Sequence, residues 1–170
     1  MSSAAAMKTW PFITLLWALS FPAQADGITE QVRNAYSCLP SLADPPDEMV
    51  LFKDGKYSSP SIPLAEMRAM ASGTLDGKTA AVVEIVWNTG GSGNWEIVAL
   101  YRLMNGTVTF QGVYWPAADL PDGGTMVRRI EIKHDKIHLF GEDPLHHRII
   151  SKPLVVTSSV FERCRTTDRR

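Results

Sequence analysis

Residues 101–110 read Tyr-Arg-Leu-Met-Asn-Gly-Thr-Val-Thr-Phe, and this stretch decides the fold. Asn105-Gly106 joins two alternating runs, and Asn-Gly is the strongest short-range signal for a β-hairpin because both residues tolerate a positive φ. A slipped register would lose the match of apolar or small residues across the two strands. The register that the turn predicts gives these pairs: Met104–Thr107, Leu103–Val108, Tyr101–Phe110, Ala99–Gly112 and Ile97–Tyr114.

A second hairpin precedes the first, through the glycine-rich connection 88–94. Placing Trp87 opposite Trp95 brings Ile85 to Ile97, and one sheet face then becomes apolar enough to be a core. The reverse face mixes charged side chains with valines and Leu100, so we expect another part of the chain to cover some of it. The loop 90–93 is interpreted as a hairpin tip, because a phosphate-binding loop normally opens a helix. The expected core face consists of Val83, Ile85, Trp87, Trp95, Ile97, Tyr101, Leu103, Val108, Phe110 and Tyr114.

Further elements extend this sheet in both directions. A hairpin is predicted over 128–140, turning on His134-Asp135, with Glu131 opposite His138 on the outer side. Strands are predicted over 67–75 and 154–161, a short hairpin over 49–57, and one amphipathic helix over 26–39, ended by Pro40. The predicted fold class is mainly β (β-rich α+β), a curved or partly closed antiparallel sheet of about seven to nine strands with one N-terminal helix.

Residues 1–25 resemble a secretory signal peptide. Lys8 supplies the positive region, residues 10–19 form an uncharged and mostly apolar run, and Ala23-Gln24-Ala25 matches a small-x-small cleavage pattern. The apolar run is shorter than the roughly 20 helical residues that span a bilayer. We therefore expect cleavage after Ala25, a single exported domain over 26–170 and a periplasmic or secreted location, with no transmembrane anchor after cleavage.

The chain contains two cysteines, Cys38 and Cys164, near the two ends of the expected domain. In an oxidising compartment an even pair most simply forms a disulfide. The alternative is a reactive thiol at Cys164, because Arg163 and Arg165 beside it would lower a thiol pKa. The formal net charge of −1 for the whole chain argues against a nucleic-acid partner, which requires a basic face.

Candidate functional residues lie on the mixed face of the sheet. Glu84 and Glu96 fall on a diagonal of the strand pairing, at a separation that suits the paired carboxylates of a glycosidase. Solvated charges on a sheet face are the alternative interpretation. Arg102 and Trp115 are candidates for ligand or partner contact, Trp115 because aromatic residues at strand ends often anchor partners.

Four histidines, His134, His138, His146 and His147, gather in the last third of the chain with acidic residues nearby. Imidazole and carboxylate groups suit zinc or a similar ion. Only Glu131 and His138 share a face in the predicted register, so they are the candidate ligands of a metal. Surface histidines in turns are the commoner case, and we expect neither a metal nor another cofactor.

Three segments together carry a resemblance: Gly73-Thr74-Leu75-Asp76-Gly77-Lys78, Ala80-Ala81-Val82-Val83 and Asn88-Thr89-Gly90-Gly91-Ser92-Gly93. They resemble a pattern in small exported bacterial proteins of unassigned activity. In that pattern the first segment is richer in aspartate, in the manner of calcium-binding loops. Here Asp76 is the only acid in the segment, and calcium needs about six oxygen ligands or more. The resemblance implies export and the fold type, and it implies no activity.

The sequence therefore favours a non-enzymatic module of the bacterial cell envelope that binds an envelope protein or an envelope ligand. A small exported hydrolase that uses Glu84 and Glu96, or the histidine-rich segment, is the alternative. A structural or assembly component is a third hypothesis.

Overall fold

The computed structural model describes residues 23–41, 47–91, 93–117, 119–121, 126–143 and 145–165. The signal peptide predicted for residues 1–25 lies outside these ranges, apart from residues 23–25, which begin the helix. The fold is mainly β, with 57% of the described residues in strands and 9% in helices, and its antiparallel sheet is curled. These features confirm the predicted fold class.

The described chain contains eleven strands, slightly more than expected because several are only two to four residues long. In chain order the elements are α1 (Ala23–Arg33), β1 (Tyr36–Leu39), β2 (Glu48–Leu51), β3 (Lys56–Tyr57), β4 (Leu64–Leu75), β5 (Lys78–Asn88), β6 (Trp95–Met104), β7 (Thr107–Tyr114), β8 (Val127–Lys133), β9 (Lys136–Asp143), β10 (Arg148–Ile149), β11 (Leu154–Val156) and the 3-10 helix η2 (Ser158–Val160).

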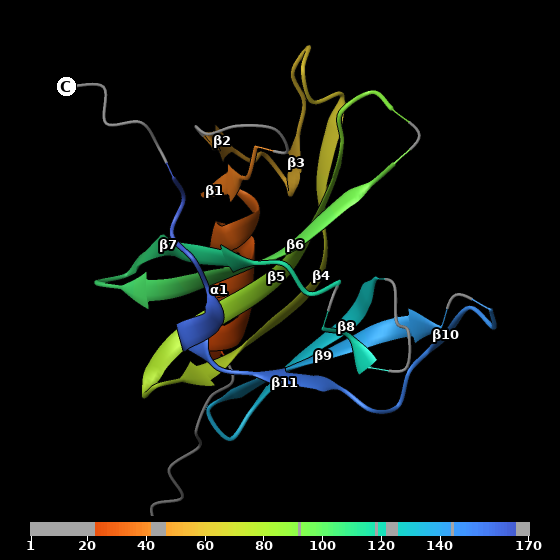
Figure 1. The fold of residues 1–170 in the computed structure, drawn as a ribbon. Helices are drawn as coiled ribbons and strands as arrows, with labels where there is room; N and C mark the ends of the chain where they lie inside the picture. Colours follow the sequence, from red (N-terminus) through yellow and green to blue (C-terminus); the bar gives the residue numbers. More distant parts are fainter. Residues whose placement is uncertain are drawn as a thin grey trace, which may run out of the picture.

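A five-stranded antiparallel sheet in the order β3-β4-β5-β6-β7 forms the middle of the molecule. On one side of it lie α1 and the two-stranded sheet β1-β2, and on the other lies the sheet that β8, β10 and β11 form around β9 (Figure 1). The central sheet is thus covered on both faces, which confirms the expectation that its mixed face would not be bare.

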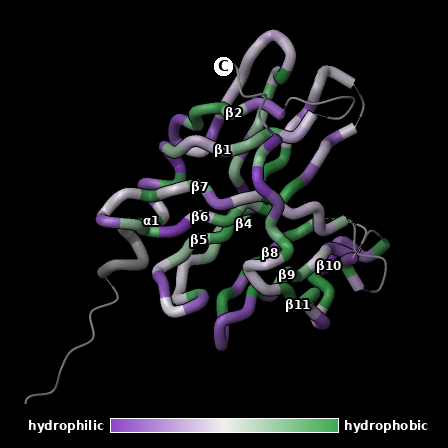
Figure 2. The backbone as a smooth tube through the Cα atoms, turned by 60° about the vertical axis from the view of Figure 1, so that its left-hand side comes forward, coloured by the Kyte–Doolittle hydropathy of each residue, from purple (hydrophilic) through white to green (hydrophobic). Residues whose placement is uncertain are grey.

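Each face of the central sheet has its own hydrophobic core. The first core joins α1, β1 and β2 to one face, with Trp87, Ile97 and Tyr101 at its centre. The second core joins Val82 and Val98 of the opposite face to β8, β9 and β11. In Figure 2 the hydrophobic colouring accordingly runs along the central strands and along the strands of the second sheet that pack against them.

The predicted β5–β6 register is confirmed in full, and so is that of the β8–β9 hairpin, including Glu131 opposite His138. The β6–β7 register is confirmed as far as Tyr101–Phe110. Beyond it a β-bulge shifts the pairing by one residue, so the predicted pairs Ala99–Gly112 and Ile97–Tyr114 are wrong. Tyr114 pairs with Val98 instead and packs against the second core, because a shift of one residue moves a side chain to the other face.

The predicted helix over 26–39 ends earlier than expected. α1 stops at Arg33, whose carbonyl accepts a hydrogen bond of 2.8 Å from the N–H of Gly55. Residues 36–39 then form β1 and pair with β2. The apolar spacing of Ala35, Tyr36 and Leu39 suited a helix, but a strand partner distant in sequence overrides local periodicity.

Two other predicted elements are shorter or paired differently. The segment 49–57 is not a hairpin of its own, because β2 pairs with β1 and only a Lys53–Lys56 bridge closes the turn at Asp54-Gly55. The last strand covers Leu154–Val156, after which η2 leads the chain to a bridge between Glu162 and Val113.

The predicted disulfide between Cys38 and Cys164 is confirmed, with the two Cα atoms 5.7 Å apart. Asp47 ties the same region together, because its carboxylate accepts hydrogen bonds from the backbone N–H groups of Ser41 and Arg165. A disulfide fits a location outside the cytoplasm. None of the described helices has the length and apolar character needed to cross a membrane.

Candidate functional site

The two candidate catalytic carboxylates lie inside the molecule. Glu84 of β5 opposes Val98 and Glu96 of β6 opposes Val86, so the two acids occupy diagonal positions on neighbouring strands. Both side chains point to the face that the second sheet covers, and they are only 1% and 7% exposed. The prediction that Glu84 and Glu96 lie on one face is therefore confirmed. The alternative, that they are solvated charges on an exposed sheet face, is wrong because both are buried.

Two β-bulges supply the hydrogen bonds of this pair. The β4 bulge places Arg68 and Ala69 opposite Glu84, and the N–H of Ala69 donates to Glu84 Oε2 at 3.2 Å. The β8 bulge lies between Val127 and Arg129, and the N–H of Val127 donates to Glu96 Oε1 at 2.8 Å. A bulge turns a backbone N–H away from the strand pairing, which makes it available to a side chain.

Each carboxylate also has a buried oxygen, Oε1 of Glu84 and Oε2 of Glu96, without a hydrogen-bond partner among the described residues. Burial away from water raises the pKa of Glu84, and it raises the pKa of Glu96 to about 7, with the nearby charge of Glu84 contributing. The N–H donors at the bulges and the guanidinium groups of Arg68 and Arg128 oppose this rise. Near neutral pH the pair therefore holds a proton more readily than exposed glutamates do.

A raised glutamate pKa is a property that general acids share, but catalysis also requires access to substrate. In the described part of the chain the unpartnered oxygens of Glu84 and Glu96 are buried, and β8 binds Glu96 directly, so a sugar chain does not reach either carboxylate in this arrangement. Glu84 binds the backbone of β4 within the central sheet, whereas Glu96 binds the backbone of β8 and so forms a polar link between the two layers.

Arg102, a candidate for partner contact, is also buried and binds within the chain. Its guanidinium donates to the carbonyl of Leu75 and to the carboxylate of Asp76, each at 2.5 Å, and Ser158 donates to the same carboxylate at 2.6 Å. These bonds fasten the β4–β5 turn to β6 and η2. They also occupy Asp76, the acid of the segment that resembles a calcium loop.

Trp115, the other candidate for partner contact, is 39% exposed. Its ring centroid lies 5.7 Å from that of Trp87 and 6.5 Å from that of Trp95. Trp95 is 41% exposed, so the two outer rings form an aromatic patch over the buried Trp87. The position at a strand end leaves Trp115 available to a partner.

The candidate metal ligands Glu131 and His138 lie opposite each other in the β8–β9 hairpin. The carboxylate of Glu131, however, already forms ion pairs with two basic side chains. Lys133 Nζ lies 2.6 Å from one oxygen and Arg129 Nε 3.5 Å from the other. The hydrogen bond from Lys133 is the main reason that the pKa of Glu131 is lowered. This arrangement neutralises the carboxylate and does not favour a metal.

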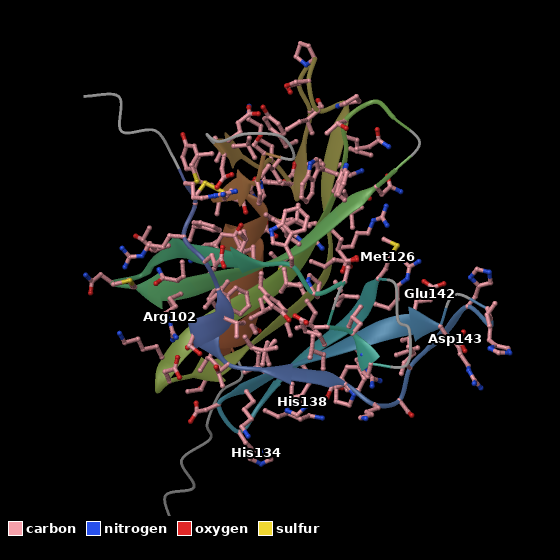
Figure 3. The ribbon with its side chains drawn as sticks, viewed as in Figure 1. Arg102, Met126, His134, His138, Glu142 and Asp143 are labelled. Carbon is pink, nitrogen blue, oxygen red and sulfur yellow. A yellow bond between two sulfur atoms is a disulfide. The ribbon has the colours of Figure 1, made fainter. Side chains whose placement is uncertain are left out.

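The histidines are spread along the β8–β9 hairpin and beyond it. In Figure 3 His134 lies at the turn of the hairpin, and Glu142 and Asp143 lie at its opposite end. There His146 bonds to Asp143 at 2.7 Å and His147 to Glu142 at 3.0 Å. The hydrogen bond from His146 is the largest of the effects that lower the pKa of Asp143 to about 2.

Among the described residues, one cluster of three possible metal ligands has its ligand atoms within 4.8 Å of one another. It consists of Cys38, Asp47 and Cys164. The two sulfur atoms of this group are bonded to each other, so they are not available as thiolates. The reactive-thiol alternative for Cys164 is excluded in this structure for the same reason.

A groove that the sequence did not indicate opens on the other side of the molecule. Its volume is about 510 Å³, and residues 107–110 of β7 form one wall. The paired residues Tyr36 and Leu51 of β1 and β2 are the opposite wall, and the C-terminal end of α1 closes it. Tyr36 is 58% and Leu51 39% exposed, and none of the described residues that line the groove is charged. We call this feature the β1–β7 groove.

No signal in the sequence marks this groove, because it is assembled from four elements and depends on where α1 ends. Had residues 36–39 continued the helix, Tyr36 would not form its wall. Comparisons with protein-family models, with curated proteins and with solved structures found no match to this chain.

Proposed function

We propose that this protein is an exported, non-enzymatic binding module of the bacterial cell envelope, and that the β1–β7 groove is where it contacts its partner. The observation that carries the proposal is the exposure of Tyr36 and Leu51 beside an open, uncharged groove. Large apolar side chains at the edge of a concave surface are typical of interaction sites.

The composition of the groove supports a protein or peptide partner more than a charged small molecule. Apolar contacts come from Tyr36, Leu51, Val108 and Phe110, and polar contacts come from uncharged side chains such as Thr109. An anionic or cationic ligand would enter without a counter-charge, which is unfavourable. Tyrosine is also among the residues that contribute most to binding at protein interfaces.

Other features agree with this function. The disulfide supports export, and so does the resemblance of 73–78, 80–83 and 88–93 to small exported bacterial proteins. The burial of Glu84 and Glu96 disfavours the alternative of a hydrolase that uses them. The patch of Trp95 and Trp115 is a second exposed apolar surface, against which binding at the groove can be compared.

The experiment is photo-crosslinking in the envelope of the native host. The photoreactive residue benzoylphenylalanine replaces Tyr36 in one variant and Trp115 in a second. In a third variant it replaces Val155, an exposed residue of β11 that lies outside the groove. We expect a discrete crosslinked protein with the Tyr36 variant that the Val155 variant does not give.

The crosslinked protein is then identified and purified, and its affinity is measured for the unsubstituted chain and for the Tyr36→Ser variant. Truncating an interface tyrosine costs about 2 kcal/mol at a hot spot, so we expect binding to weaken about 30-fold. Equal affinity for both proteins, or crosslinks only from Trp115, would place the binding surface elsewhere.

A further inference from the structure

The wall of the groove that β7 forms is a strand edge. Asn105 and Gly106 have φ values of 52° and 79°, so the turn is of the type that makes Met104 and Thr107 a hydrogen-bonded pair. Hydrogen-bonded and non-hydrogen-bonded pairs alternate along antiparallel strands. The backbone N–H and C=O groups of Val108 and Phe110 therefore point away from β6, toward the groove.

These outward groups are largely without partners among the described residues. The Phe110 carbonyl accepts a bond of 3.2 Å from the side-chain amide of Gln111. The described chain supplies no other hydrogen bond to the outward N–H of Phe110 or to either backbone group of Val108. A strand edge in this state is a template for another extended chain.

Further along, the same edge already carries an added segment. Val113 and Glu162 exchange two backbone hydrogen bonds of 2.8 Å each, so the C-terminal segment pairs with β7 beyond the bulge. The stretch 108–110, whose outer edge pairs with no described strand, continues the line of this pairing into the groove. The β7 edge thus accepts a backbone segment at Val113, and among the described residues no strand pairs with the rest of this edge.

The opposite wall presents backbone groups as well. The N–H of Phe52 donates to the carbonyl of Ala35, so the alternation turns the backbone groups of Tyr36 away from β2. β1 lies between β2 and β7, as Figure 1 shows. The backbone groups of Tyr36 that point away from β2 therefore point toward the groove. An extended chain in the groove would find hydrogen-bonding groups on both sides and apolar side chains around it.

We propose that the partner binds as an added β-strand: an extended, uncharged segment of another protein pairs with Val108 and Phe110 of β7 and places alternate apolar side chains against Tyr36 and Leu51. This inference rests on the proposed function and specifies the partner's conformation. Strand addition takes affinity from backbone hydrogen bonds and specificity from pockets for every second side chain. A second copy of the chain fits less well as the partner. The β7 edge that it would offer for pairing lies inside its own groove, beside its own Tyr36.

The experiment begins with a random octapeptide display library, selected on the oxidised full chain purified after expression with its leader. Binding of an enriched peptide is measured to the unsubstituted protein, to Val108→Pro and to Val108→Thr. Proline removes the outward N–H without breaking a bond to β6, as proline does on natural edge strands. Threonine keeps the N–H and the β-branched shape. We expect affinity to fall about tenfold with proline and less than about threefold with threonine.

A second measurement uses only the unsubstituted protein, so it decides the matter even where Val108→Pro does not fold. Amide hydrogen exchange is followed by NMR with and without the peptide. Strand addition predicts slower exchange at Val108 and Phe110. If the peptide leaves both amides unchanged while Tyr36→Ser abolishes its binding, strand addition is wrong and the proposed function stands.

Two further results would overturn the inference in other ways. If the selection enriches no peptide, or Tyr36→Ser and Val108→Pro both leave peptide binding unchanged, the groove is not a peptide site and the proposed function loses its support as well. If light scattering shows a dimer that Val108→Pro converts to a monomer, the edge belongs to a second copy of this chain.

Discussion

Glu84 and Glu96 face the same buried space from neighbouring strands, and the charge of Glu84 helps to raise the pKa of Glu96. Each acid binds the N–H of a β-bulge in a different neighbouring strand, Ala69 in β4 and Val127 in β8. Glu96 therefore joins the central sheet to the second sheet, and Glu84 joins β5 to β4 within the central sheet, both through groups whose charge depends on pH. Arg68 and Arg128, the charged residues of the two bulges, lower the pKa of both acids through their positive charge and so oppose the effect of burial.

The first prediction concerns the pH dependence of stability. The pKa of Glu96 is about 7 in the folded protein against 4.5 for an ordinary glutamate. Below pH 4.5 both states hold the proton; between 4.5 and 7 only the folded state does, so the free energy of unfolding falls as pH rises through this window. The full loss above pH 7 is about 3 kcal/mol. Glu84 acts in the same direction.

Urea unfolding at several pH values between 4 and 8 measures this dependence. The Glu96→Gln variant should lose most of it and be the more stable protein at pH 8. Glu30→Gln, which changes an exposed glutamate of α1, is the matched control. Identical pH slopes in Glu96→Gln and in the unsubstituted protein would show that Glu96 is not buried as an acid.

The second prediction concerns Gly112, where the C-terminal segment crosses β7. A Cβ atom at this position would lie 2.6 Å from the carbonyl oxygen of Glu162, which is too close for any residue other than glycine. Gly112→Ala should displace the segment, expose the amides of Val113 and Glu162 to exchange, and lower stability by about 1–3 kcal/mol. Gly91→Ala, in an open loop position, should leave both quantities unchanged.

The third prediction concerns the disulfide, which links residues 126 positions apart. Closing so long a loop stabilises the folded state by about 3–5 kcal/mol in the chain-entropy account. Reduction, or replacement of both Cys38 and Cys164 by serine, should lower the urea midpoint accordingly. Equal midpoints for the oxidised and reduced proteins would mean that Asp47 and the Val113–Glu162 bridge suffice to hold the C-terminal segment.

The fourth prediction separates a structural role from a binding role for Arg102. Its guanidinium satisfies the carbonyl of Leu75, and Arg102→Met would leave that carbonyl without its donor. We expect a loss of stability of about 1–3 kcal/mol and unchanged affinity for a groove-binding peptide. Weaker peptide binding by the folded variant would restore Arg102 as a contact residue.

Much of the fold could be predicted because turn chemistry is local. Asn105-Gly106 and His134-Asp135 adopt positive φ as expected, and they fix the registers of two hairpins. The bulges in β4, β7 and β8 could not be predicted, because no residue type marks an extra residue in a strand. The bulge in β7 alone moved Tyr114 to the opposite core.

The candidate site was harder to predict than the fold. The prediction that Glu84 and Glu96 share one face is correct, but their burial depends on β8. The residue of β8 that binds Glu96 is Val127, 31 positions further along the chain. The groove depends on the end of α1 at Arg33, which Gly55 caps from a distant turn. Contacts of this kind link distant segments and leave no pattern in the local sequence.

The most direct test of the account is a crystal structure of the oxidised protein with a selected octapeptide bound. We expect an extended peptide in the β1–β7 groove, hydrogen-bonded to the backbone of Val108 and Phe110, with an apolar side chain against Tyr36. A peptide seated on Trp95 and Trp115 instead, with the groove unchanged, would contradict the claim that this groove is the binding surface.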